Sequence, residues 1–388
     1  MPGFPLSNRA KNLSPFYVMD ILARAKALAE QGKSIYHLEI GEPDFATADR
    51  IIDAGIEALK QKKTHYTPAL GLPELREQVA AYYQRKFSLV LDPNRIVITP
   101  GASGALQLAL SCLLDAGQNV LMADPGYPCN SNIAQILGLH ATAVPVSEAS
   151  NFQLDAALLL QHWSSETRAA MVATPSNPTG TILPVQQLLE LCHQVAIKNG
   201  RLIVDEIYQG LVYDENDYTA LQYSDDCFVI NSFSKYFGMT GWRLGWMVVP
   251  EFYVDAIDRI SQNIFLAPAT ISQYAALTAL KEEVQGELDE RRDIFKQRRD
   301  FLLPALERLG FTVAAKPQGA FYIYANCEKF TDDSFHWVKQ LLDETGVALT
   351  PGIDFGEYQA AKHCRFAYTS SQENLQRAVE KIDIFVNR

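Results

Sequence analysis

The feature that most constrains the fold is a series of short apolar segments, each ended by turn residues, that alternate with helix-period segments. The apolar segments are 95–101 (RIVITPG), 119–126 (NVLMADPG), 169–180 (AAMVATPSNPTG), 201–206 (RLIVDE) and 227–235 (CFVINSFSK). Segments such as ALQLALSCLLDAG and LPVQQLLELCHQVAIKNG lie between them and repeat apolar residues with a helical period. This alternation predicts an α/β fold with three layers, a mainly parallel sheet covered by helices on both faces. In such a sheet, a functional site is expected at the carboxyl ends of the strands.

A second lobe is expected because the chain has 388 residues, and single cores stop growing near ~250–300 residues. A charge-rich helical pattern runs over 275–308 and is interrupted by Pro304. After it, FTVAAKPQGAFYIYANC and CRFAYTS look like strands of a smaller α+β domain. We therefore predict a large domain of residues 46–290 and a small domain of residues 1–45 and 291–388.

Composition excludes several classes of function. The formal net charge is −11 and the basic residues form no long runs, so no nucleic-acid-binding surface is predicted. The N-terminus lacks an apolar core and no stretch approaches ~18 uninterrupted apolar residues, which favours a cytoplasmic protein. The six cysteines lie far apart without CxxC or Cys/His metal spacing, and we interpret them as buried thiols in a reducing compartment, with no metal site.

The segment NSFSKYFGMTGWRLGW, residues 231–246, raises the question of function. Lys235 stands between two serines and a glycine-rich stretch that carries Arg243. A lone lysine in a polar loop is usually solvated. A functional interpretation therefore needs support from the rest of the chain.

Further polar and aromatic residues follow the predicted strands. Asp205 ends RLIVD, where it would be either a buried carboxylate or a cap of the next helix. Asn177 lies in PSNPTG and Tyr127 in DPGYP, and each alone is typical of a turn. Tyr208 follows Asp205 by three residues, about one helical turn, so both side chains could contact the same ligand.

The glycine-rich segment TPGASGAL, residues 99–106, joins a predicted strand to a predicted helix. Such a turn offers backbone N–H groups and a helix N-terminus to an anion. The segment is not GxGxxG, a Walker loop or a nucleophile elbow. By itself it is therefore weak evidence for a phosphate site.

Five separated motifs occur in order: TPGASGAL, DPGYP, PSNPTG, DEIY and SFSKYFGMTGWRLGW. In order and spacing the chain resembles the class I/II aminotransferases, which are aspartate aminotransferase-like, fold-type-I enzymes dependent on pyridoxal 5′-phosphate. The resemblance extends from GEPDF at 41–45 to CRFAYTS at 364–370. It implies the fold-type-I transferase architecture and this cofactor.

The resemblance also implies roles around the cofactor ring. Lys235 would form the Schiff base and then act as general base and acid in the proton shift. Asp205 would keep the ring nitrogen protonated, so that the ring accepts electrons. Asn177 and Tyr208 would hydrogen-bond the phenolic oxygen, and Tyr127 would stack on the ring.

For the phosphate, the resemblance implies a cup built from Ser232, Ser234, Arg243 and the N–H groups of Ala102 and Ser103. A guanidinium matches a phosphate dianion well. The cup would explain why serines and an arginine flank the reactive lysine: they anchor the cofactor whose aldehyde the lysine bonds.

Substrate binding and assembly follow from the same resemblance. Arg365 would bind the substrate α-carboxylate, together with Asn177 and the loop at Gly41. A structural salt bridge is the alternative for Arg365. Tyr66 would reach the phosphate of a neighbouring subunit, so a homodimer with shared active sites is implied.

One departure concerns the substrate. Some aspartate-specific relatives use a lysine in the phosphate loop for the distal carboxylate, and Ser103 stands at that position here. The segment SPFYVMDIL, residues 14–22, would line the mouth of the pocket. We therefore expect neutral donors such as alanine or larger apolar amino acids rather than aspartate, with glutamate and 2-oxoglutarate tolerated as the exchange pair.

The expected activity is the transfer of an amino group from an L-amino acid to a 2-oxo acid by a ping-pong mechanism. A carbon–sulfur β-lyase on the same fold is the alternative, because the outcome after Cα deprotonation depends on pocket geometry. A non-catalytic ligand sensor fused to a DNA-binding domain is a further alternative. It is disfavoured because only about 40 residues precede GEPDF, too few for a winged helix, and the catalytic positions are filled.

Overall fold

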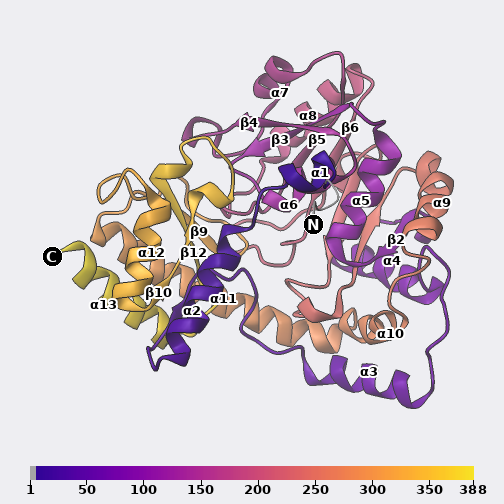
Figure 1. Ribbon diagram of the computed structural model, residues 1–388. Helices are drawn as coiled ribbons and strands as arrows, with labels where there is room; N and C mark the ends of the chain where they lie inside the picture. Colours follow the sequence, from indigo (N-terminus) through magenta and orange to yellow (C-terminus); the bar gives the residue numbers. More distant parts are fainter. Residues whose placement is uncertain (1–5) are drawn as a thin grey trace, which may run out of the picture.

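The computed structural model describes residues 6–388 and contains a central sheet of seven strands (Figure 1). Strand β8 pairs antiparallel with β2 and β7, and the other four pairs are parallel. The predicted α/β class with a mainly parallel sheet is therefore confirmed. In spatial order, the strands are β2 (Ile96–Thr99), β8 (Gly245–Val248), β7 (Phe228–Ser232), β6 (Arg201–Asp205), β5 (Thr167–Ala173), β3 (Asn119–Asp124) and β4 (His140–Pro145).

Both faces of this sheet are buried, because successive strand residues enter two different apolar cores. In β6, Ile203 belongs to one core, while Leu202 and Val204 belong to the other. In β2, Val97 and Ile98 divide in the same way. Continuous apolar segments of this kind are expected where helices cover both faces.

The helices divide between the two faces accordingly. One core takes side chains from α5 (Gly101–Leu113), α6 (Pro128–Ile136) and α9 (Val254–Ile264). The other core takes side chains from α3 (Asp49–Lys60), α4 (Pro73–Phe87), α7 (Ala156–His162), α8 (Val185–Ile197) and α10 (Thr270–Ala279). The sheet is therefore the middle of three layers.

A smaller lobe contains the C-terminal end of the chain, whereas the described N-terminal end lies against α6 of the large lobe (Figure 1). It has an antiparallel sheet of β11 (Thr350–Pro351), β12 (His363–Ala367) and β9 (Tyr322–Asn326). A short parallel pair joins β1 (Tyr36–His37) to β10 (Val347–Ala348). Its helices are α2 (Tyr17–Glu30), α12 (Ser334–Thr345) and α13 (Gln372–Val386), and the short α1 (Asn8–Asn12) precedes them.

Helix α11 (Glu282–Leu309) runs from α10 to the smaller lobe (Figure 1). The predicted interruption at Pro304 is wrong, because the helix continues through it and packs Leu302 and Leu306 into the core. The break between helices falls at 280–281 instead. The division into 46–290 and 1–45 plus 291–388 stays a prediction; its boundary at 290 falls inside α11, and residues 1–5 lie outside the described part.

Two further expectations bear on the class of protein. Within residues 6–388, no helix is long and apolar enough to cross a membrane, and no group of His, Cys, Asp and Glu could hold a metal ion. All six thiols are free. Only Cys227, Cys327 and Cys364 are buried, however, and the other three are half-buried.

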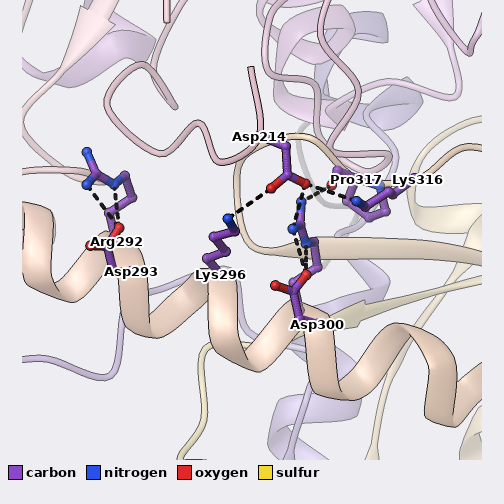
Figure 2. Close-up of polar contacts among 8 residues, drawn as sticks. Asp214, Arg292, Asp293, Lys296, Asp300, Lys316 and Pro317 are labelled. Atoms are coloured by element: carbon purple, nitrogen blue, oxygen red, sulfur yellow. Dashed lines mark hydrogen bonds and ion pairs between the residues drawn. The ribbon is translucent and has the colours of Figure 1, made fainter. Parts of the chain in front are cut away.

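One carboxylate ties the large sheet's loops to α11 (Figure 2). Asp214 lies 3.0 Å from the Nζ atoms of both Lys296 and Lys316 and 2.8 Å from the guanidinium of Arg299. Arg299 is only 1% exposed and also donates to the carbonyl oxygen of Pro317 at 2.9 Å. The loop that carries Asp214 is thereby fixed to the helix that joins the two lobes.

We expect Asp214→Asn to lower the melting temperature at pH 7 by about 2–4 °C. Hydrogen bonds, first of all from Lys316, hold the pKa of Asp214 well below its usual range. A depressed acid pKa stabilises the fold above the unfolded value of ~3.9 and loses this effect as the pH falls below it. The deficit of the variant should therefore shrink below about pH 4.

The matched control is Asp293→Asn, which breaks the exposed pair with Arg292 in the same view. Its melting temperature should stay within about 1 °C of wild type. Thermal unfolding of both variants between pH 3 and 7 provides the comparison. Equal shifts for the two variants would contradict a special role for Asp214.

Candidate active site

A cavity of about 340 Å³ lies where the carboxyl ends of the large sheet's strands meet the smaller lobe. Its volume is within the range of small-molecule and cofactor sites. The structure brings together every predicted site residue except Tyr66 around it: Gly41, Ala102, Ser103, Tyr127, Asn177, Asp205, Tyr208, Ser232, Ser234, Lys235, Arg243 and Arg365. These residues come from segments far apart in the sequence.

Lys235 follows β7 and points its amine into this cavity. Its Nζ donates a hydrogen bond to the carbonyl oxygen of Gly41 at 2.8 Å. Removal from water, followed by the nearby charge of Arg365, lowers the pKa of Lys235 to about 8. A substantial fraction of the amine is therefore neutral near physiological pH, as a nucleophile or base requires.

Asp205 is the last residue of β6, and its side chain is 7% exposed. One carboxylate oxygen accepts the N–H of Ile207 at 3.2 Å. Burial raises the pKa of Asp205 to about 7, because an unsolvated charge is costly, while the charge of Lys235 acts in the opposite direction. A cation or an N–H⁺ group bound in the cavity would restore the ionised form.

A cup of hydrogen-bond donors that could hold an anion lies at the first turn of α5. The helix begins at Gly101 without a side-chain cap, so its first N–H groups, including those of Ala102 and Ser103, face the cavity unsatisfied. The guanidinium of Arg243 packs so close that a Cβ at Gly101 would lie 2.8 Å from its Nη2. Ser232 and Ser234 complete the same wall.

Arg365 lies on β12 and is buried. Its guanidinium donates to Asn177 Oδ1 at 2.9 Å and to the carbonyl oxygen of Glu39 at 2.7 Å. It also lies over the rings of Tyr322 and Phe355, at 4.2 and 4.7 Å from their centroids. The guanidinium is thus held rigidly at the cavity wall, where a carboxylate could bind it.

Several lining residues were missed by the sequence interpretation. Tyr322 places its hydroxyl 2.8 Å from that of Tyr208, and a Cβ at Gly41 would lie 2.1 Å from the same oxygen. Asp354 and Phe355 enter from a loop of the smaller lobe. No local pattern in FYIY or in PGIDFG indicates which of its residues faces the site.

Tyr66 is the predicted residue that the cavity does not include. Its side chain is 83% exposed. The hydroxyl of Thr270 donates to the carbonyl of His65 at 2.8 Å, which fixes this segment beside the start of α10. Because Tyr66 does not line the cavity of its own chain, a functional contact of this residue would be with another subunit.

The residues present fit pyridoxal 5′-phosphate on structural grounds. The uncapped α5 terminus with Arg243 suits a phosphate dianion. The buried carboxylate of Asp205 suits a protonated ring nitrogen, and the amine of Lys235 suits an aldehyde. Each group of the cofactor thus has a chemically matched partner.

Comparison with known proteins agrees with this arrangement. Residues 33–382 match the family model described as aminotransferase class I and II. The chain is 38% identical over 370 residues to the valine–pyruvate aminotransferase of Mycobacterium tuberculosis, covering 95% of each chain. It is 39% identical over 386 residues to a (5-formylfuran-3-yl)methyl phosphate transaminase of Methanocaldococcus jannaschii, covering 99% of this chain and 100% of that one.

Solved structures show the same similarity. A crystal structure of an aminotransferase from Mycobacterium tuberculosis matches with a TM-score of 0.96 and 36% identity, over 99% of this chain and 100% of that chain. Aspartate aminotransferase from Thermus thermophilus with maleate matches with a TM-score of 0.92 and 31% identity, over 98% and 100%. The similarity therefore extends over both lobes.

We expect the rate of covalent attachment of pyridoxal 5′-phosphate to the cofactor-free protein to rise with pH and level off above about pH 8. The neutral amine is the nucleophile, and the pKa of Lys235 is lowered to about 8. An ordinary lysine, with a pKa of ~10.4, would keep accelerating toward pH 10. Absorbance after rapid mixing between pH 6 and 10 measures the rate.

Borohydride reduction followed by peptide mapping identifies the lysine. The label should fall on Lys235 and disappear in Lys235→Ala. A label on Lys198 or Lys316 instead would contradict the assignment.

Proposed function

The chain belongs to the aminotransferase class I and II family, and we propose that Lys235 is the residue that moves the proton in its reaction. The protein is a pyridoxal 5′-phosphate-dependent aminotransferase that moves an amino group from an amino acid to a 2-oxo acid. The observation that carries the residue assignment is the convergence of Lys235, Asp205 and Arg365 on one cavity. Together they supply a base, a ring-nitrogen partner and a carboxylate-binding group.

When bound, pyridoxal 5′-phosphate would supply an aldehyde and a ring that accepts electrons. Lys235 would attach to this group at rest and, once released, would take the proton from the substrate Cα. Asp205 would hold a proton on the ring nitrogen. Asn177 and Tyr208 would donate to the phenolic oxygen, and Tyr127 would stack on the ring face.

The phosphate would bind in the cup of Ala102, Ser103, Ser232, Ser234 and Arg243. Charge-assisted bonds of this kind are about twice as strong as neutral ones. Because the cup belongs to α5 and the loops of the large sheet while Arg365 lies on β12 of the smaller lobe, the phosphate and the substrate would be held from different elements. Glycine at 101 supports this role, because a Cβ there would lie 2.8 Å from the guanidinium and the backbone φ of +69° favours glycine.

The substrate α-carboxylate would bind Arg365, with Asn177 and the backbone at Gly41 beside it. Three hydrogen bonds and two aromatic rings already orient the guanidinium. This preorganisation reduces the cost of ordering the site on substrate binding. Binding at this point would leave the Cα–H near the amine of Lys235.

We expect Asp205→Asn to slow the half-reaction with an amino acid by about 10²-fold or more, because the ring loses the anion that keeps its nitrogen protonated. Single-turnover spectra of the cofactor-loaded protein measure this rate. The control is Asp226→Asn, which changes an exposed carboxylate and should leave the rate unchanged. An unimpaired Asp205→Asn half-reaction would remove Asp205 from the mechanism.

We further infer a homodimer in which Tyr66 reaches the phosphate cup of the neighbouring subunit. Tyr66 is an aromatic side chain left exposed on the described surface. Ile56 and Leu59 of α3, at 44% and 55%, and Leu266, at 47%, are also exposed. A second subunit on this face would cover these apolar side chains.

Mixed dimers test shared active sites. Lys235→Ala and Tyr66→Ala variants should each be impaired, but equal amounts reassembled after mixing should recover about a quarter of the wild-type sites. One site of each hybrid would then have both residues intact. Activity of the mixture and sedimentation of wild type measure this, and a fully active monomer would exclude sharing.

We propose the cytoplasm as the compartment in which the enzyme works. The six free thiols support it, because a reducing compartment preserves them.

A further inference from the structure

We propose that Asp354 fastens the start of helix α2 over the substrate pocket and makes the site select amino donors with uncharged apolar side chains over dicarboxylic donors. This inference rests on the roles proposed above for Lys235 and Arg365. It assigns a positioning and specificity function to a carboxylate that takes no part in the chemistry.

The walls of the cavity determine where a donor side chain must lie. If the α-carboxylate of a donor binds Arg365 and its amino group faces Lys235, these two contacts fix the orientation of Cα. The direction of the donor side chain is then fixed as well. Apart from the polar groups with roles proposed above, the cavity is lined largely by apolar and aromatic residues, which include Phe16, Val18, Met19, Leu22, Tyr127 and Phe355. Four of them belong to the start of α2 or precede it directly. A neutral apolar side chain would therefore bury its surface against α2.

The charges around the cavity disfavour a second carboxylate. Among the described residues that line it, the cationic side chains are Lys235, Arg243 and Arg365, and each already has a proposed partner. Asp354 borders the same space, and its side chain is 5% exposed. A distal carboxylate would lose water, find no free cation among these lining residues, and lie close to another carboxylate.

Asp354 also holds α2 in place. One of its oxygens accepts the N–H of Tyr17, the first residue of the helix, at 2.7 Å. Phe16, at the cap position, provides no side-chain cap, so a residue more than 300 positions away in the sequence replaces it. Tyr17 packs edge-on against Phe335 of α12 at 5.2 Å, which gives the helix a second contact with the smaller lobe.

The hydrogen bond and the negative charge belong to the same side chain but can be separated. Burial raises the pKa of Asp354, while the N–H groups of Tyr17 and Val18 and the charge of Arg365 favour its ionised form. Asparagine keeps an oxygen that can accept the N–H of Tyr17 and removes the charge. Alanine removes both.

The experiment measures kcat/KM of the cofactor-loaded enzyme in half-reactions with phenylalanine, methionine, alanine, aspartate, glutamate and lysine. For wild type, we expect phenylalanine and methionine to exceed aspartate and glutamate by about tenfold or more. Asp354→Asn should raise kcat/KM for aspartate about fivefold and change phenylalanine less than about twofold. The gain should appear mainly in KM.

Asp354→Ala should lower kcat/KM for phenylalanine about tenfold through KM, because the wall that α2 forms is no longer fixed. Alanine as donor should change less than about twofold, since its methyl group is too short to depend on that wall. The control is Asp155→Ala, which removes a similar carboxylate cap from α7, where it accepts the N–H of Leu158 at 2.8 Å. It should leave all donors unaffected.

Several results would overturn the inference. These are a wild-type preference for aspartate or lysine over phenylalanine, an Asp354→Asn variant with unchanged aspartate kinetics, or equal losses for phenylalanine and alanine in Asp354→Ala. If Asp354→Ala does not fold, Asp354→Asn still decides the effect of the charge. A wild-type enzyme that reacts with no donor would instead contradict the roles of Lys235 and Arg365.

Discussion

The guanidinium of Arg365 joins three parts of the chain that the rest of the site depends on. It binds the backbone at Glu39, the amide of Asn177 in the large sheet's loops and, through its own strand, the smaller lobe. If these contacts broke while the guanidinium stayed buried, its charge would lose its partners, so the contacts hold the segments together. The group proposed to bind the substrate carboxylate is therefore also the group that holds the two lobes together.

The same lack of water acts on the two titrating groups at the cavity in opposite directions. Burial lowers the pKa of Lys235 to about 8 and raises the pKa of Asp205 to about 7. A cationic acid and a neutral acid respond oppositely because burial always disfavours the charged form. Burial, the largest cause of each shift, therefore brings both pKa values close to physiological pH. Groups with such pKa values are suited to acid–base chemistry.

Much of this arrangement is predictable because chemistry in an open α/β sheet is confined to the ends of the strands. Asp205 and Lys235 follow apolar segments directly, and the structure brings both to one cavity. Strand β8 was missed because no α-helix separates it from β7. The alternation of strands and helices, on which the prediction relied, is absent at this point. The break predicted at Pro304 was wrong because the packing of α11 outweighs the backbone hydrogen bond that proline cannot donate. Tyr322 and Asp354 were missed because their partners, Gly41 and Tyr17, are distant in sequence, and no local pattern encodes such a contact.

Two kinds of wall enclose the cavity, and they differ in how far evolution can change them. At Gly41 and Gly101 the wall is backbone, and any side chain would collide with Tyr322 or Arg243. The wall at the start of α2 consists of ordinary apolar side chains that other residues could replace. Changes in the side chains of one helix could therefore alter the choice of substrate, whereas a side chain at Gly41 or Gly101 would force Tyr322 or Arg243 to move and so disturb the chemistry itself.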